Sequence, residues 1–492
     1  MFRISLPRAR FPRAAMAFAA ALVCPLYSQT AESFPQATSD GAWTFFSDPR
    51  SIVYKGTRDM TYLAFLDKAG SDRVWSIDHA SGKVDTFTLH VALQKDDHDN
   101  PALYLRKDGR IAAYYQRHGN DKFALRRTTV RPEDITAWGK EDTIVMPEGV
   151  TYCHPFRLDG EDGRLFVFSR SVGFHPTIMT SDDEGAAFSK PLKLIGGPGL
   201  RPYVKYVSDG ATNIHIAFTD GHPRNEDSNS IYYIRYSKGA FYKADGTLIR
   251  KLSDLAAKAI EPAEADRVYD GRTLGRAWIW DIALDAKGAP ALVHSVCPAE
   301  NDHRYHYARW NGNAWEDGQM TKAGGWFPQT PAGTVEREPH YSGGIILDPI
   351  DPAIVYLSKP SAKGVFEIEK WTTADGGKTW SSKALTAGSA KGNARPILPH
   401  PMLGQRPAHR MLFWMNGDYE HYTNYATGIR YSMWTEPTMV LFPGRTGEKL
   451  GKAQGLLDGM GRDARGRLSP HGEFTPGGAG AAIPFPDRAP AP

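Results

Sequence analysis

A short apolar strand pattern recurs along the chain and limits the folds that the sequence can adopt. Each copy has a turn with Gly or Asp, then a few residues of Val, Ile, Leu, Phe or Tyr, then a polar or charged residue. Successive copies begin 49 to 76 residues apart. The seven copies are 61–65 (TYLAF), 110–115 (RIAAYY), 164–168 (RLFVF), 213–218 (NIHIAF), 289–294 (APALVH), 353–357 (AIVYL) and 410–414 (RMLFW). This spacing predicts an all-β fold, a seven-bladed β-propeller of four-stranded antiparallel blades.

Two segments predict the same kind of turn in two of these blades. Residues 181–188 (SDDEGAAF) and 373–380 (TADGGKTW) both fit Ser/Thr-x-Asp-x-Gly-x-x-Phe/Trp, the Asp-box turn found between the outer strands of sialidase-type blades. Asp caps such a turn, Gly takes a positive φ, and the aromatic side chain fills the gap between neighbouring strands. Their role is structural, so they support the propeller and predict no chemistry.

The two ends of the chain differ from the repeats. Residues 1–30 carry four arginines ahead of the apolar run 14–27, which predicts a signal peptide and a secreted or periplasmic protein. An uncleaved anchor, or a lipoprotein at Cys24, is the weaker interpretation. Residues 443–492 are rich in Gly, Arg, Ala and Pro and predict a flexible tail. The catalytic propeller is therefore expected over 31–442.

Charge and hydropathy exclude two classes of partner. The formal net charge of +4 falls to near zero when the arginine-rich start is removed, and no Lys/Arg stripe follows, so no nucleic-acid partner is expected. After residue 30 no apolar run approaches the roughly 20 residues that cross a bilayer, so no membrane span is expected. Cys153 and Cys297 then remain, and they could form one disulfide, stay as two free thiols, or place one thiol in a metal site.

Two histidines are the leading candidates for chemistry. His98 precedes one predicted strand and His118 follows the next, within 96–119 (DDHDNPALYLRKDGRIAAYYQRHG). An antiparallel hairpin with its turn at 107–109 brings both residues out at the same end. We therefore expect the two rings to be neighbours at one rim of the propeller. The alternative is that each histidine only satisfies a loop hydrogen bond.

Other polar side chains stand at equivalent places in later repeats. Tyr152 enters a strand as His98 does, and Arg170 leaves the following strand as His118 does. Equivalent positions of different blades line one central funnel, so we expect these side chains to converge there. The residues expected to bind substrate are Asn100, Tyr203, Lys205, Arg224, Arg337, His340 and Tyr341.

This set of side chains suits an anionic substrate better than ordinary glycoside hydrolysis. Hydrolases generally place two carboxyl groups across the scissile bond, whereas these rims supply mainly His, Tyr and Arg. β-Elimination on a uronic acid needs a cation at the carboxylate, a base for the C5 proton and an acid for the leaving O4. Arginine, histidine and tyrosine can take those three roles near neutral pH.

The same segments resemble a known family. Residues 96–119, 151–158 (TYCHPFRL), 201–210 (RPYVKYVSDG) and 218–224 (FTDGHPR) are similar to BNR-repeat seven-bladed propellers that include ulvan lyases and rhamnose-glucuronate lyases. The similarity covers roughly 40–440. It implies β-elimination at a glucuronate or iduronate joined to rhamnose, with an unsaturated uronyl product and no cofactor required for the chemistry.

The resemblance also implies roles for particular residues. By position, His98 and His118 match the family's two active-site histidines, Tyr152 its tyrosine, and Arg170 its carboxylate-facing arginine. The resemblance leaves open which histidine is the base.

Two further residues match less closely. Some relatives bind a structural zinc through His and Cys, so His222 and Cys297 could hold such an ion here. Cys153 and His154 stand where relatives more often have Pro-Asn, so this loop departs from the family pattern.

The leading hypothesis is an exported lyase acting on an anionic, ulvan-like polysaccharide. A non-catalytic glycan-binding propeller and a glycoside hydrolase on the same scaffold are the alternatives.

Overall fold

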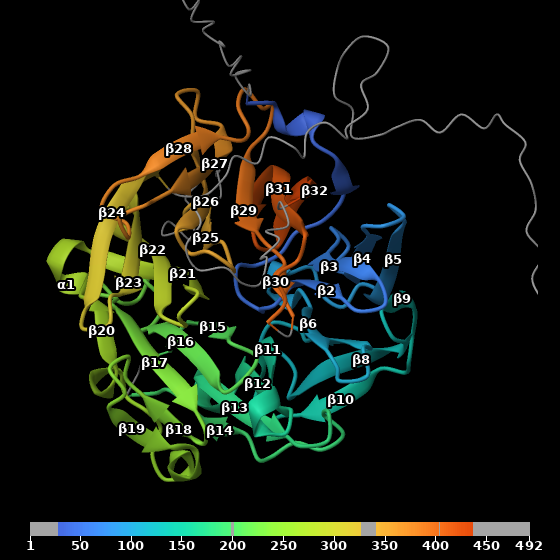
Figure 1. Cartoon of the computed structure of the whole chain (residues 1–492), viewed down its shortest axis with the longest axis vertical. Helices are drawn as coiled ribbons and strands as arrows, with labels where there is room; N and C mark the ends of the chain where they lie inside the picture. The colour runs from blue at the N-terminus through green and yellow to red at the C-terminus, as the bar shows by residue number, and fades with distance from the viewer. Residues whose placement is uncertain (1–27, 198–200, 326–340, 403, 436–492) are drawn as a thin grey trace, which may run out of the picture. The chain divides into compact units, whose positions relative to one another are not determined.

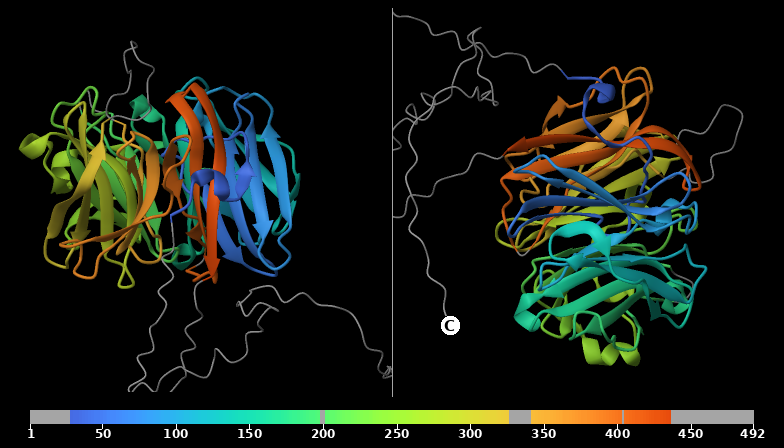
Figure 2. Two further views of the ribbon diagram at one scale, coloured as in Figure 1. Left: turned by 90° about the horizontal axis from the view of Figure 1, so that it is seen from above. Right: turned by 90° about the vertical axis from the view of Figure 1, so that its right-hand side faces the viewer.

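The computed structural model describes residues 28–197, 201–325, 341–402 and 404–435. In this part of the chain seven antiparallel sheets stand around a common axis as the blades of a propeller (Figure 1). Their strands run through the thickness of the ring, as the side views show (Figure 2). The predicted all-β fold of seven four-stranded blades is confirmed. The expected signal peptide, apart from its last three residues, and the expected tail lie outside the described residues.

The first four blades follow the chain in order. Blade 1 contains β2 (Ser51–Lys55), β3 (Asp59–Leu66), β4 (Asp72–Asp78) and β5 (Val84–His90), with β30 (His400–Pro401) parallel to β2. Blade 2 contains β6 (Ala102–Leu105), β7 (Ile111–Tyr115), β8 (Phe123–Arg131) and β10 (Asp142–Val145), with β9 (Asp134–Trp138) paired to β8. Blade 3 contains β11 (Thr151–Leu158), β12 (Arg164–Arg170), β13 (Pro176–Ser181) and β14 (Leu192–Lys193). Blade 4 contains β15 (Val204–Ser208), β16 (Asn213–Thr219), β17 (Ile231–Ser237) and β18 (Ala240–Tyr242), extended by β19 (Leu248–Lys251) and β20 (Asp266–Tyr269).

Three further blades complete the ring. Blade 5 contains β21 (Arg276–Leu284), β22 (Pro290–Ala299), β23 (Asp302–Trp310) and β24 (Trp315–Gly324). Blade 6 contains β25 (Ile345–Leu347), β26 (Ile354–Pro360), β27 (Phe366–Thr372) and β28 (Ser381–Ala384). Blade 7 contains β29 (Asn393–Ile397), β31 (His409–His421), β32 (Asn424–Thr435) and β1 (Gln36–Thr38).

In the part of the chain that the structure describes, helical structure is confined to short turns outside the strands. The described α-helix is α1 (Gly271–Leu274). The 3-10 turns are η1 (Ala31–Ser33), η2 (Asp97–Asp99), η3 (Asp159–Glu161), η4 (Val172–Phe174), η5 (Leu252–Ala256) and η6 (Pro262–Glu264). Among the described residues no helix has the length and apolar character needed to cross a membrane.

The ring is closed by strands from both ends of the described chain. β1 pairs antiparallel with β32, with Gln36 opposite Arg430. Figure 2 shows the dark blue start of the described chain beside the red-orange β31 and β32. Because one blade combines strands from the two ends, the ring has no gap at this junction.

The repeated sequence pattern corresponds to one strand position in every blade. Its seven copies lie in β3, β7, β12, β16, β22, β26 and β31, the second strand outward from the axis in each blade. These strands are buried on both faces between neighbouring sheets. Phe166 and Phe168 of β12 share one buried cluster with Ile216 and Phe218 of β16. Burying each such side chain stabilises the fold by about 1.5–3 kcal/mol, which explains why this strand is the most recognisable.

Both predicted Asp-box turns join the third and fourth strands of their blades. Between β27 and β28, Asp375 accepts the backbone N–H groups of Lys378 and Thr379, and Thr373 accepts that of Gly377. Gly377 has φ 92°, a conformation that favours glycine. In the turn between β13 and β14, Ser181 likewise accepts the N–H of Gly185, and the Asp183 side chain accepts that of Ala187. Their structural role is thus confirmed.

Candidate active site

His98 and His118 meet at one mouth of the ring. His98 lies in η2, just before β6, and His118 follows β7, so the β6–β7 hairpin returns both to the same end. The hairpin turns at Gly109, whose N–H donates to the carbonyl of Arg106. The two imidazoles stack with 4.0 Å between ring centroids and 10° between planes. The prediction that the histidines are neighbours is confirmed.

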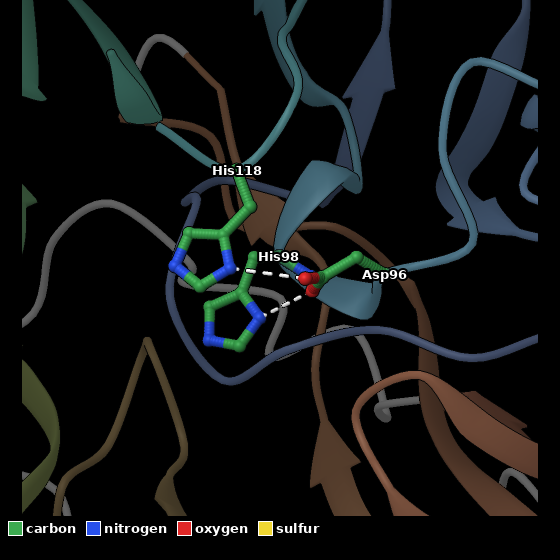
Figure 3. Close-up of side chains that lie close together, drawn as sticks. All are labelled: Asp96, His98 and His118. Carbon is green, nitrogen blue, oxygen red and sulfur yellow. Dashed lines mark hydrogen bonds and ion pairs between the residues drawn. The ribbon is translucent and has the colours of Figure 1, made fainter. Parts of the chain in front are cut away.

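Asp96 holds both imidazoles through its two carboxylate oxygens (Figure 3). His98 Nδ1 lies 2.6 Å from Asp96 Oδ1, and His118 Nδ1 lies 3.0 Å from Oδ2. An ionised carboxylate only accepts hydrogen bonds, so each Nδ1 carries the proton and donates it. In the neutral form of either ring, Nε2 then keeps its lone pair. Two basic nitrogens result, both on the side of the rings away from Asp96.

Burial and neighbouring charges tune this pair. Burial, the His98 ring and Arg170 lower the pKa of His118 to about 4, against the opposing effect of Asp96. Burial alone would raise the pKa of Asp96, but the two imidazoles hold that pKa well below its usual range. At neutral pH the site thus combines a neutral His118 with an ionised Asp96, the state in which His118 can accept a proton.

Arg170 approaches the histidines from blade 3. Its Nη2 lies 3.4 Å from His118 Nε2, and because arginine can only donate, His118 Nε2 is the acceptor. The Arg170 guanidinium carbon lies 5.0 Å from the ring centroids of both Tyr152 and Tyr203. Arg170 Nε is buried and has no hydrogen-bond partner within the described parts of the chain. The two tyrosine rings and His118 thus hold the Arg170 guanidinium at the mouth of the ring, and its Nε–H group is not used by these contacts.

Tyr152 occupies an unusual backbone conformation at the start of β11. Its φ is 57°, and the pairing of β11 with β12 shifts register between Thr151 and Cys153. A non-glycine residue in this region costs about 1–3 kcal/mol, and such strain is found preferentially at functional sites. Burial raises the pKa of the Tyr152 hydroxyl well above its ordinary value, with Arg170 opposing. Tyr152 is therefore a protonated donor across the pH range of a folded protein.

Two important residues of the site were not identified from the sequence. Asp96 lies in the quoted motif two residues before His98, and that short spacing was its signal. Tyr422 comes from the turn between β31 and β32 of blade 7, far away in the sequence, where no motif marks it. Its ring meets that of His98 edge-on with 4.8 Å between centroids. The site thus draws on blades 2, 3, 4 and 7.

The residues expected to bind substrate divide into three groups. Tyr203 lies at the site, and Tyr341 and the exposed Arg224 lie beyond it, toward blades 4 to 6. Asn100 and Lys205 instead make internal contacts, contrary to the expectation that they line the funnel. Arg337 and His340 lie outside the described residues.

The internal positions of Asn100 and Lys205 have clear causes. Asn100 is fully buried, and its Oδ1 accepts the N–H of Thr44 at 3.0 Å. Lys205 is 3% exposed and its Nζ lies 2.6 Å from Asp48 Oδ2, inside the ring. Asp48 also binds Arg50. Buried charges need a partner of opposite charge, and Lys205 and Arg50 both pair with Asp48. The Lys205 side chain therefore serves the interior of the fold and does not face the substrate.

The two cysteines of the described chain are not joined in a disulfide. Cys153 on β11 and Cys297 on β22 are buried and not bonded to one another. His222 packs against Trp278 and its Nδ1 accepts the N–H of Arg224. In the described part of the chain, neither His222 nor Cys297 belongs to a cluster of three ligating side chains. A zinc ion at this pair stays a prediction, and no step of chemistry depends on it.

A separate cavity of about 430 Å³ lies at the opposite ends of the innermost strands. Leu105, Ser208 and Leu284, each at or near the last residue of its strand, are among its lining residues. None of the side chains at the histidine mouth lines it. The chemistry described above, rather than cavity volume, therefore identifies the candidate active site.

Known proteins share this architecture. Residues 60–323 match the model of the BNR repeat-containing family, a span that includes His98, His118, Tyr152 and Arg170. No curated protein sequence matches the chain.

Two solved structures share the fold, each described as an ulvan lyase from a new family of polysaccharide lyases. The first is 16% identical with a TM-score of 0.62, over 82% of this chain and 96% of that one. The second is 15% identical with a TM-score of 0.61, over 81% and 94% of the two chains, and is bound to -[GlcA(1-4)Rha3S]-. At such low identity the likeness is one of fold, so the chain has a scaffold like that of a polysaccharide lyase.

Proposed function

The chain belongs to the BNR repeat-containing family, and from this premise we propose that it is an exported polysaccharide lyase. Its substrate is an anionic glycan that contains uronic acid and rhamnose, of the ulvan type. It cleaves the chain by β-elimination at the uronate. The scaffold shared with an ulvan lyase supports the proposal at the level of fold.

One observation carries the chemical part of the proposal. A single carboxylate, Asp96, holds two imidazoles so that their basic Nε2 atoms face away from it. The Arg170 guanidinium stands at one of these nitrogens and against the Tyr152 ring. Base, cation and hydroxyl donor therefore lie within one small site, as elimination next to a carboxylate requires.

Each of these side chains has its own role in the reaction. Arg170 binds the uronate carboxylate and stabilises the charge that develops on it when C5 loses its proton. An imidazole Nε2 of His98 or His118 accepts that proton. The C5–H electron pair forms the C4–C5 double bond as the C4–O4 bond breaks. The Tyr152 hydroxyl protonates O4, and the proton on the imidazole then returns to the tyrosinate.

Neighbouring aromatic rings suit the sugar parts of such a substrate. Tyr203 and Tyr422 flank the Arg170 and His98 side chains. Their flat faces and hydroxyl groups can pack on a deoxy sugar while the charged groups hold the uronate. Arg224, exposed on blade 4, offers a further cation for an anionic chain.

The proposal is tested with the purified protein and ulvan or a rhamnose-linked glucuronate glycan. We expect ultraviolet absorbance of an unsaturated uronate to rise with time, and His98→Ala and His118→Ala to abolish the rise. New reducing ends without this absorbance would show a hydrolase instead. Neither signal on any uronate glycan, together with retained binding to it, would show a glycan-binding propeller.

A further inference from the structure

A second cluster of ligating side chains lies on blade 5, away from the candidate active site. His294 on β22 is directly opposite His306 on β23, and Asp317 on β24 is opposite Ala308, two residues along from His306. Side chains that are opposite or diagonal on one face of a sheet lie within reach of one another. One ligating atom from each of the three residues lies within 4.8 Å of the other two.

The two imidazoles of this cluster are buried without the partners that such rings need. His294 is fully buried and His306 is 5% exposed. Neither ring nitrogen of His294, nor Nε2 of His306, has a hydrogen-bond partner among the described residues. Buried polar atoms normally have a partner, because leaving them unpaired costs free energy. Tyr269 covers the cluster with its ring 5.2 Å from that of His294, while its hydroxyl donates to Gly275.

The separations of the ligating atoms fit a shared metal ion. His306 Nδ1 is 3.0 Å from Asp317 Oδ2, and His294 Nε2 is 3.4 Å from Asp317 Oδ1. Ligands at about 2.0–2.2 Å from a tetrahedral zinc ion lie about 3.3 Å apart. His294 Nε2 is close to the carboxylate without forming a hydrogen bond to it. His306 Nδ1 forms a hydrogen bond with Asp317 Oδ2, and a bound ion would replace it, because a ligating imidazole nitrogen must be unprotonated.

We propose that His294, His306 and Asp317 bind a divalent transition metal of the zinc class. Two imidazoles and one carboxylate are ligands that such ions prefer, and water would take the fourth position. The Asp317 side chain is 19% exposed, which gives the ion a path from solvent. The ion joins β22, β23 and β24, so its effect is to stabilise blade 5. This site is distinct from His222 and Cys297, and it does not depend on the proposed lyase activity.

Metal analysis of the full chain tests this site. The chelated protein is reloaded with Zn²⁺ or Co²⁺, and bound metal is measured by elemental analysis. Asp317→Asn should bind one equivalent less than the unsubstituted protein, and His306→Gln should do the same. We expect Co²⁺ to give the intense visible absorption of a tetrahedral ion and Zn²⁺ to raise the midpoint of thermal unfolding.

Glu316→Gln is the matched control. Glu316 precedes Asp317 on β24 but binds Arg309 and Asn311, so the same change of charge there should leave the metal content unaltered. Equal metal content in Asp317→Asn and the unsubstituted protein would overturn the proposal. So would the absence of bound Zn²⁺ or Co²⁺ from the unsubstituted protein. Circular dichroism checks that each variant is folded, and the partly exposed Asp317 keeps the test valid if His306→Gln does not fold.

Discussion

Asp97, the residue before His98, forms a buried ion pair with Arg395 of blade 7, with 2.6 Å between Oδ2 and Nη1. Tyr419 of β31 donates to the same oxygen, and Arg395 also donates to the carbonyl of Trp43. The turn that carries His98 is thus bound to the blade that closes the ring. Placement of His98 and closure of the propeller are therefore coupled.

This coupling predicts a large loss of stability when either partner is changed. Asp97→Asn and Arg395→Met should each lower the free energy of unfolding by about 3–5 kcal/mol, because each leaves a buried charge without its partner. The double variant should lose less than the sum of the two single variants. Urea unfolding followed by tryptophan fluorescence measures all three. Additive losses would show that the two side chains act independently.

A second prediction concerns the bridging role of Asp96. In Asp96→Asn the side chain keeps one acceptor oxygen but gains an NH₂ group, so one imidazole must move its proton to Nε2. That ring can then no longer act as a base. We expect kcat to fall about 10²–10⁴-fold, the contribution that a positioned general base makes to a reaction rate. KM should change little, because the Asp96 side chain is only 4% exposed and lies behind the rings.

Asp108→Asn is the control for this experiment. Asp108 lies in the turn of the same hairpin, where it is 42% exposed and binds Arg110. Its substitution should leave both kinetic constants unchanged. If Asp96→Asn raised KM and left kcat intact, Asp96 would contribute to substrate binding rather than to the state of the imidazoles.

A third prediction concerns the dependence of the reaction on pH. The base must be unprotonated, so kcat/KM falls as pH drops through the pKa of the imidazole in the free enzyme. With His118 as the base, that fall should lie near pH 4 rather than near 6.5, because burial lowers the pKa of His118 to about 4. No loss is expected up to about pH 9, since the pKa of Tyr152 is raised. The profile is measured only where circular dichroism shows a folded protein, and an acid limb near pH 6.5 would exclude His118 as the base.

Much of the fold could be predicted because its signal is local and repeated. Each second strand of a blade is buried on both faces, so it must be apolar in every copy, and the Asp-box turns need fixed residue types. The pairing of His98 with His118 was accessible for the same reason, since one hairpin determines it. The short inner strand β29 of blade 7 and the three-residue β1 at the outer edge of that blade depend on closure of the ring instead.

The remaining parts of the site depend on contacts between distant segments. The Tyr422 ring of blade 7 packs against the His98 ring, and Arg395 of the same blade forms an ion pair with Asp97. Lys205 looked like a substrate ligand because its motif repeats a rim layout, but Asp48 draws its side chain into the ring. The left-handed backbone of Tyr152 also has no sequence signal, because tyrosine rarely adopts it.

A fourth prediction tests whether Arg170 binds the uronate carboxylate. Arg170→Gln should lower kcat/KM on the free uronate glycan about 10²–10³-fold, the cost of removing one preorganised donor from a developing charge. On the methyl-esterified glycan, where no carboxylate charge exists, the variant and the unsubstituted protein should differ by only a few fold. Arg164→Gln, at the opposite end of β12, is the control, because Arg164 pairs with Asp182 and Glu161. An equal loss on both glycans would mean that Arg170 acts by packing between Tyr152 and Tyr203 and not by holding the carboxylate.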